Sequence, residues 1–159
     1  MAESDELYTL RNAFFLGNFQ EALAEASTIP RPKSDLLRLE RDVLVARAHI
    51  ALGDARAATA GIRDDAPAPM RAVKLFAAFS AAAPGSAARA SVLASVDALV
   101  TEAEADAAGT TAAAATAPLV AALAGTMCVA DERARADPST AAAPLTPLPL
   151  TATHRPLSR

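Results

Sequence analysis

The chain has 159 residues, of which 52% are hydrophobic and only 4% aromatic, and its formal net charge is −3. This small charge does not imply a polyanionic partner. Nucleic-acid binding is not expected either, because the sequence has no cluster of lysine and arginine residues interleaved with aromatic residues. Much of the apolar content is alanine, and stretches that alternate β-branched and polar residues are nearly absent. We therefore predict an all-α protein with closely approaching helices, long enough for one core.

The N-terminal part has the pattern of two helices joined by a tight turn. Leu7, Leu10 and Phe14 are spaced three and four residues apart, which places them on one face of a first helix. Gly17 ends this helix, and Asn18 is a favourable N-cap for a second helix. We expect a helical hairpin whose two helices share one apolar face.

A longer amphipathic helix follows, capped by Ser34 and extending to about Leu52. Its apolar stripe is formed by Leu39, Val43, Ala46 and Ile50. We expect the opposite face to be solvated, and it carries the charged residues Arg38, Glu40, Arg41, Asp42 and Arg47. A short partner helix is predicted over residues 55–62.

The two hairpins have the same turn. Gly17 and Gly53 are 36 residues apart, and each is followed five residues later by a small residue, Ala22 or Ala58. Tetratricopeptide repeats are helix–turn–helix units with a period of about 34 residues. The glycine permits the sharp turn, and the alanine lets the two helices approach closely. This spacing predicts stacked, tetratricopeptide-like helical hairpins.

The following segments continue the helical pattern. A third pair is predicted from the apolar stripe that begins at Met70, through a turn at residues 83–86, to a helix over residues 87–107. Residues 109–130 then form a run of 22 residues without charge, long enough to cross a bilayer. We favour a buried helix of a fourth repeat, because the run contains Pro118 and has no basic anchor at either end.

The composition changes at residue 131. From there to the end of the chain, proline, serine, threonine and alanine dominate without a helical stripe. We therefore predict two regions: a helical-repeat domain over residues 4–130 and a disordered tail over residues 131–159.

The sequence offers no pattern for catalysis, cofactor binding or a metal site. His49 lies late in an amphipathic helix, His154 is isolated in the tail, and Cys128 is expected to be a small buried thiol. We thus expect a protein that works through its surface and is not an enzyme. Candidate protein-binding residues lie off the main apolar stripes: Tyr8, Arg11, Asn12, Phe15, Arg41, Asp42 and Arg47.

Three blocks in this order resemble the epsilon subunit of coatomer, the COPI vesicle coat: residues 12–20 (NAFFLGNFQ), 40–44 (ERDVL) and 72–77 (AVKLFA). The resemblance implies a right-handed tetratricopeptide-like solenoid without catalytic residues. It also implies binding to the C-terminal domain of the alpha coatomer subunit and association with other coatomer subunits. By the same resemblance, the protein is cytoplasmic, reaches Golgi membranes and COPI vesicles only through the coat, and acts in retrograde transport to the endoplasmic reticulum.

The resemblance ends near Ala130, whereas members of this family continue with further repeats. Our hypothesis is that residues 131–159 derive from a translated intron, a shifted frame or a truncated isoform. Two other readings stay open. One is another tetratricopeptide adaptor, such as a peptide-binding co-chaperone, and the other is a small membrane-associated protein anchored through residues 109–130.

Overall fold

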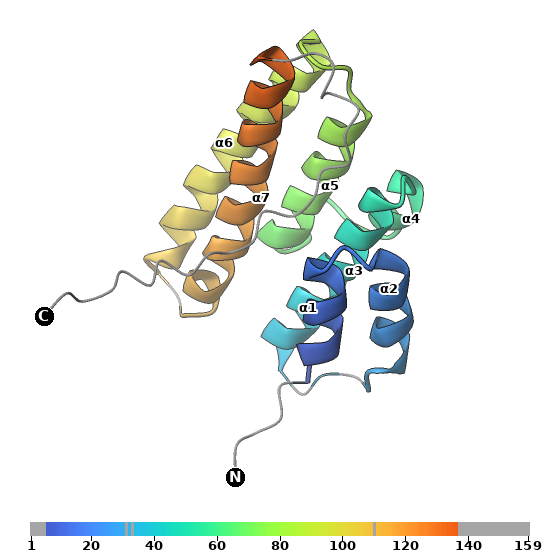
Figure 1. Cartoon of the computed structure of the whole chain (residues 1–159). Coiled ribbons are helices and arrows are strands. Elements are labelled where there is room, and N and C mark those ends of the chain that lie inside the picture. The colour runs from blue at the N-terminus through green and yellow to red at the C-terminus, as the bar shows by residue number, and fades with distance from the viewer. Residues whose placement is uncertain (1–5, 31, 33, 110, 137–159) are drawn as a thin grey trace, which may run out of the picture.

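The computed structural model describes residues 6–30, 32, 34–109 and 111–136, and within these ranges the regular structure is helical, with no strand. The helices follow one another in a chain of antiparallel neighbours (Figure 1). They are α1 (Tyr8–Phe15), α2 (Phe19–Thr28), α3 (Asp35–Ala51), α4 (Ala55–Thr59), α5 (Ala68–Ala81), α6 (Ala87–Ala107) and α7 (Thr111–Ala136). The predicted all-α class with helical hairpins is confirmed. Most of the predicted tail, residues 137–159, lies outside the described residues.

The turns of the first two hairpins have the same geometry. Gly17 and Gly53 adopt φ values of 83° and 85°, which glycine reaches without the steric cost of a Cβ atom. In each turn the glycine N–H donates to a carbonyl three residues back, and the next N–H donates to one five residues back, at 2.8–3.1 Å. Ala22 and Ala58 are both buried, as the repeat predicts.

The helix starts are capped only partly as predicted. The Leu36 N–H donates to Ser34 Oγ at 3.2 Å, which confirms the cap of α3. Asn18 does occupy the N-cap position of α2, but its side chain makes no capping hydrogen bond. Its amide instead donates to Glu21 Oε2 at 3.1 Å. Further along, α4 ends at Thr59, three residues earlier than predicted, because Gly61 turns the chain with a φ of 85°.

Helix α3 is buried on two sides, and this corrects the prediction of one apolar stripe opposite a solvated face. Leu44 and Ala48 join the core formed with α1 and α2. Val43 and Ile50 join a second core that is built with α4, α5, α6 and α7. Helix α3 therefore lies between the N-terminal pair and the rest of the molecule (Figure 1).

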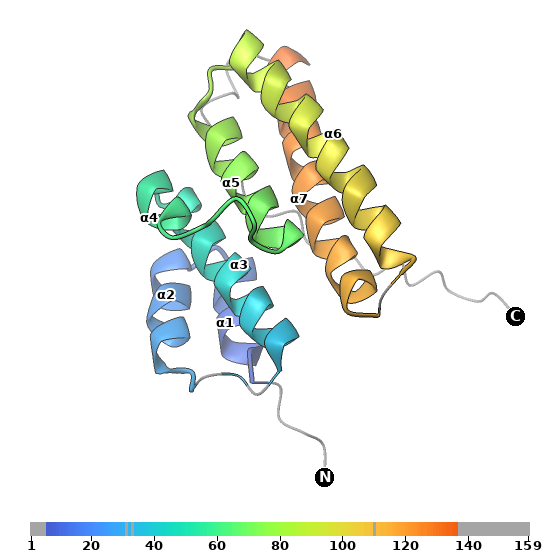
Figure 2. The same cartoon turned by 180° about the vertical axis from the view of Figure 1, so that it is seen from behind.

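The C-terminal half is a bundle of three helices. Helices α6 and α7 run antiparallel along their length, and α5 packs against both (Figure 2). Val120, Leu123 and Met127 of α7 are at most 1% exposed in this bundle, which confirms the prediction of a buried helix for these positions. Helix α7 is therefore a core helix whose apolar side faces α5 and α6.

Helix α7 continues to Ala136. The disordered tail predicted from residue 131 onward is therefore wrong for residues 131–136, which are helical. The reason is a buried ion pair between helices. Arg89 Nε of α6 lies 3.3 Å from Asp131 Oδ1, and Arg135 Nη2 lies 2.7 Å from Asp131 Oδ2. The Arg89 guanidinium also stacks 3.9 Å from the centre of the Phe79 ring. These contacts hold the last turns of α7 against α5 and α6.

The structure also bears on the membrane-span alternative. Within the described residues, one helix, Ala113–Ala136, is long and apolar enough to cross a membrane, with a mean hydropathy of 1.7. Its large apolar residues Val120, Leu123 and Met127 are buried in the bundle, whereas Leu119 and Val129 are partly exposed. The exposed positions between Ala114 and Cys128 carry small residues or Pro118. This distribution is typical of a core helix rather than of a lipid-facing one.

Candidate functional site

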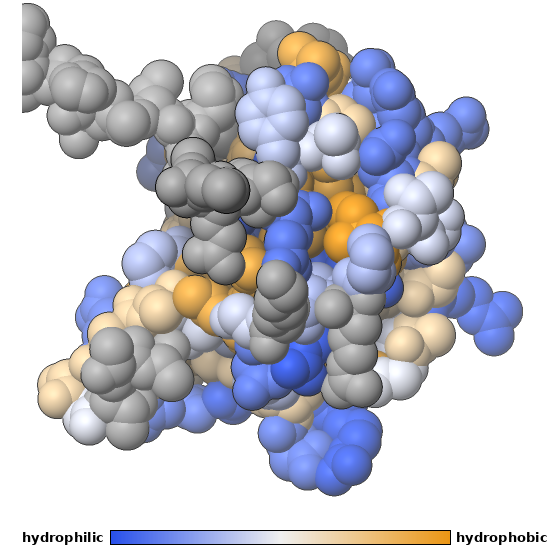
Figure 3. Space-filling model, turned by 90° about the horizontal axis from the view of Figure 1, so that it is seen from below, coloured by the Kyte–Doolittle hydropathy of each residue, from blue (hydrophilic) through white to orange (hydrophobic). Residues whose placement is uncertain are grey.

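A groove of about 430 Å³ opens between the N-terminal pair and the C-terminal bundle. Its walls come from α1, α3 and α7, whose residues are far apart in sequence. The lining residues are Arg11, Phe15, Glu40, Val43, Leu44, Arg47, Pro118, Leu119, Ala122, Gly125, Thr126 and Val129. Seen from below, apolar residues gather near the middle of the molecule, between hydrophilic side chains (Figure 3). The groove therefore has the composition of a preformed site for an apolar ligand or segment.

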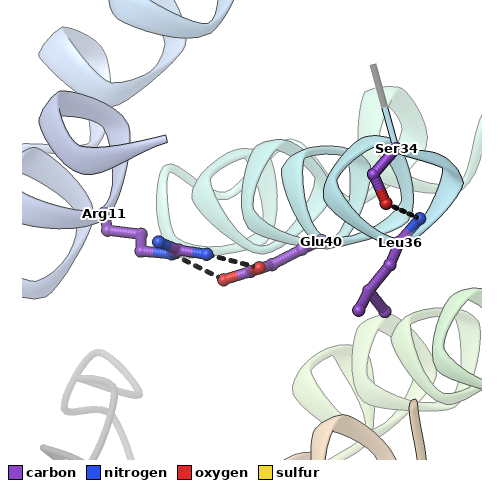
Figure 4. A network of polar contacts seen from close by, with 4 residues as sticks. All are labelled: Arg11, Ser34, Leu36 and Glu40. Atoms are coloured by element: carbon purple, nitrogen blue, oxygen red, sulfur yellow. Dashed lines mark hydrogen bonds and ion pairs between the residues drawn. The ribbon is translucent and has the colours of Figure 1, made fainter. Parts of the chain in front are cut away.

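One charged pair joins two walls of the groove. Arg11 of α1 forms a bidentate interaction with Glu40 of α3, with Nε–Oε1 and Nη2–Oε2 distances of 2.7 and 2.6 Å (Figure 4). Both side chains are partly buried, at 30% and 23% exposure. Such a charge-assisted fork is geometrically specific, so it fixes α1 relative to α3. In this contact the Arg11 guanidinium and the Glu40 carboxylate also neutralise each other's charge.

Arg47 is the second cation of the groove, and its position corrects the prediction of a solvated side chain. It is partly buried, with its guanidinium carbon 5.0 Å from the centre of the buried Phe14 ring. Burial lowers the pKa of Arg47 to about 10, so the group stays protonated at neutral pH. Within the described part of the chain, no carboxylate lies within ion-pair distance of it. Arg47 is thus a partly desolvated charge beside an apolar groove.

The structure brings three of the predicted binding residues together and leaves four apart. Arg11, Phe15 and Arg47 line the groove, and Phe15 is 43% exposed at its edge. The remaining candidates do not line it. Tyr8, Asn12 and Asp42 are exposed, and Arg41 is partly buried with an Nε that has no hydrogen-bond partner among the described residues. These four remain candidates without a shared site.

The predicted set omits one wall of the groove completely. Glu40 was assigned to the solvated face of its helix, and no residue of α7 was proposed as a binding residue. Ala122 and Gly125 are small and carry no functional group, so their types give no signal in the sequence. Their contribution is space, since a Cβ atom added at Gly125 would meet no atom within 4 Å. Only the packing of α7 beside α3 makes this space part of a groove.

The residues considered for other chemistry do not form a reactive site. Cys128 is exposed, not buried as predicted, because it follows the solvent-facing side of α7 with Ala121 and Gly125. Partial desolvation, together with nearby carboxylates, raises the pKa of its thiol. His154 lies outside the described residues. Among the residues that are described, no group of three or more histidine, cysteine, aspartate or glutamate side chains could hold a metal ion.

Comparison with known proteins places these helices in a family. The family model described as "Coatomer epsilon subunit" matches residues 3–125. Coatomer subunit epsilon-1 of Arabidopsis thaliana is 40% identical over 79 residues, which are 50% of this chain and 26% of that protein. Coatomer subunit epsilon-1 of Oryza sativa subsp. japonica is 38% identical over 79 residues, 50% of this chain and 27% of that protein.

The alignments thus span about a quarter of the curated relatives. No solved structure matches the chain. The family model, in contrast, extends over α1 to α6 and into α7, and so includes the helices on all sides of the groove. On this match, the chain belongs to the coatomer epsilon subunit family.

Proposed function

We propose that the chain is a structural subunit of the COPI vesicle coat and binds the C-terminal domain of the alpha coatomer subunit. The observation that carries this proposal is the match to the coatomer epsilon family over residues 3–125. In this role the protein has no catalytic activity and contributes an adaptor surface to the coat. It acts in the cytoplasm in retrograde Golgi-to-endoplasmic reticulum transport, and reaches Golgi membranes and vesicles only through the coat and its other subunits.

The groove is the surface that we assign to this binding. Its walls are held in place by the Arg11–Glu40 fork and by two cores that meet at α3. A rigid groove loses little conformational entropy when a partner docks, which favours affinity. Helical repeat proteins commonly bind partner segments on such inner surfaces.

A co-chaperone-like peptide binder is less well supported. That alternative relies on Arg11 and Asn12 as the start of a clamp for a terminal carboxylate. In the structure both Nε and Nη2 of Arg11 are engaged by Glu40 at 2.6–2.7 Å. A peptide carboxylate would have to displace a partly buried bidentate partner, which makes Arg11 a poor clamp residue.

The membrane-anchored alternative requires α7 to leave the bundle. Val120, Leu123 and Met127 would lose their packing against α5 and α6, and the buried Arg89–Asp131 pair would separate. We therefore expect the chain to be released from membranes by carbonate or high salt, as a coat component is. Retention in the carbonate pellet would instead support insertion of α7.

A direct binding experiment tests the coat assignment. The tagged 159-residue chain is used to capture the purified C-terminal domain of the alpha coatomer subunit, and full-length Arabidopsis epsilon-1 serves as the positive control. We expect both proteins to retain the alpha domain. Retention by the full-length relative alone would show that this chain is not a functional subunit. Capture from cell extract then reports whether other coatomer subunits accompany the alpha subunit.

A further inference from the structure

The chain contains a segment rich in proline and leucine beyond its last helix. Residues 144–150 have the sequence PLTPLPL, and residues 138–153 carry no charge. Proline fixes φ and restricts the residue before it to extended conformations, so this sequence favours polyproline II. In that conformation the backbone forms no internal hydrogen bonds, and its carbonyl oxygens are free to accept from another group. The segment therefore offers apolar side chains and hydrogen-bond acceptors, but no charge, to a surface that it reaches.

The groove between α1, α3 and α7 has complementary chemistry. Most of its lining is apolar, and Phe15 is 43% exposed at its edge. Polyproline II segments dock in aromatic-lined grooves, because the preformed chain loses little entropy on binding. Arg11 and Glu40 neutralise each other, so the lining has no carboxylate that requires a basic ligand. Arg47 has no carboxylate within ion-pair distance in the described chain, and its N–H groups can donate to carbonyl oxygens.

The course of α7 brings this segment within reach of the groove. The α7 residues that line the groove run from Pro118 to Val129, and the helix ends at Ala136. At about 1.5 Å per residue, Val129 lies about 10 Å back from that end, and the lined part of α7 is about 16 Å long. Residues 137–143 span up to about 22 Å in polyproline II geometry, which is enough for the chain to turn and return over this distance. Residues 144–150 span about another 22 Å and so match the length of the groove.

We propose that residues 144–150 dock in the groove of the same chain, antiparallel to α7, and cover its apolar walls. The leucines of the segment fill the open strip beside Ala122 and Gly125, where an added Cβ at Gly125 meets no atom within 4 Å. A short flexible connection gives an effective concentration of about 1 mM. A contact with a Kd of only about 0.1 mM is then formed in about nine chains of ten. The inference goes beyond the coat function, because it concerns a contact within one chain.

Competition with a peptide tests this contact in the full chain. The probe is a fluorescent peptide of residues 138–153, and its anisotropy is measured against the parent chain and against a tail variant with Leu145→Ser and Leu148→Ser. We expect the peptide to bind the tail variant about tenfold more tightly, because the parent's own segment competes at about 1 mM against a Kd of about 0.1 mM. Equal affinity for both chains, or no binding to either, would overturn the proposal. The control chain carries Ala152→Ser and Leu157→Ser, outside residues 144–150, and should bind the peptide as weakly as the parent does.

Substitutions in the groove locate the binding. Gly125→Leu, added to the tail variant, fills the open strip and should weaken the peptide about tenfold or more. Ala121→Leu is the matched control, because Ala121 is exposed on the same helix but does not line the groove. Phe15→Ser is a second groove variant, and thermal melts verify that each chain is folded. Unchanged peptide affinity in both folded groove variants, or an equal loss in the Ala121→Leu control, would place the segment elsewhere and contradict the proposal.

The oligomeric state separates docking within one chain from exchange between two chains. We expect light scattering after size exclusion to give a monomer for the parent at the concentrations used for the competition. A dimer that the tail variant loses would show that residues 144–150 occupy the groove of a second copy, and would overturn docking within the chain. Because no coat protein takes part in these measurements, their failure is distinct from failure of the coat assignment, which the alpha-domain capture tests.

Discussion

Asp131→Asn is the most informative single substitution for the fold of this chain. Asp131 lies five residues before the end of α7, in a segment whose composition predicts disorder, yet its carboxylate contacts Arg89 and Arg135. The substitution removes the charge and keeps the side chain's shape. It therefore tests whether the last turns of α7 are held by this ion pair.

The expected loss in the free energy of unfolding follows from the burial of the ion pair. The side chains of Asp131 and Arg89 are only 6% and 7% exposed. Without Asp131, the Arg89 cation stays buried with the Phe79 ring 3.9 Å away and an Nε that lacks a hydrogen bond in the described structure. Removal of one partner from a buried pair costs about 3–5 kcal/mol. Because the ring and the new amide still interact with Arg89, we expect about 3 kcal/mol, out of a total of roughly 5–15 kcal/mol.

Equilibrium unfolding in urea, followed by circular dichroism at 222 nm, measures this cost. Glu132→Gln is the matched control, since it removes a carboxylate at the neighbouring, exposed position of the same helix. We expect the free energy of unfolding to fall by about 3 kcal/mol for Asp131→Asn and to stay within about 0.5 kcal/mol of the parent chain for the control.

A double variant separates the buried charge from the helix itself. Arg89→Met with Asp131→Leu replaces the ion pair by apolar side chains, and methionine can still contact the Phe79 ring. Such replacements are often neutral or stabilising, so we expect most of the lost stability to return. Equal stability of Asp131→Asn and the Glu132→Gln control would refute the reasoning. It would mean that residues 131–136 add little to the fold.

Three further predictions concern the turns, α7 and a surface ion pair. Gly53→Ala should destabilise the fold by about 1–2 kcal/mol in urea, because the position has a φ of 85° in open space, so strain rather than a clash opposes the methyl group. Gly125→Ala should instead raise the thermal midpoint by about 2–4 °C, because replacing a helical glycine by alanine where there is free space stabilises the fold by roughly 1 kcal/mol. A lower thermal midpoint would contradict the open space beside Gly125. Glu102→Gln should cost less than about 1 kcal/mol at pH 7, because its pair with Arg71 is largely exposed. The hydrogen bond from Arg71 lowers the pKa of Glu102, so this stability is present above the ordinary pKa of about 4.3 and is lost as the pH falls through the lowered folded-state value. Thermal melts of both chains from pH 2 to pH 7 should therefore converge at the acidic end.

The local elements of this fold could be predicted from the sequence because their causes are local. The spacing of Leu7, Leu10 and Phe14 selects a helix and the face that it buries, and all three are buried. Gly17 and Gly53 mark the turns, since few other residues adopt a positive φ without strain. Ser34 caps α3 through a hydrogen bond that spans two residues. Each of these features depends on neighbours within one or two helical turns.

The two failed predictions that matter most for the fold and the groove depend on contacts between distant segments. The pattern of its own helix predicts that Arg47 is solvated. In the structure α3 is covered on two sides, and the Arg47 guanidinium lies over the Phe14 ring. Composition predicts that Asp131 begins a disordered tail. In the structure Arg89, 42 residues earlier in the chain, is its buried ion-pair partner. In both cases the decisive neighbour lies on another helix. Neither composition nor periodicity reports such a neighbour.

The candidate site divides in the same way. Helical periodicity alone predicted the helices and their turns, and the positions of Arg11, Phe15 and Arg47 off the apolar stripes identified three of the groove residues. The tertiary structure decided that α7 closes the groove and that Glu40 neutralises Arg11 while Arg47 keeps a free charge within the described chain. The physical reason is that helix propensity and turns act over a few residues, whereas a groove and its net charge arise only when separate helices pack together.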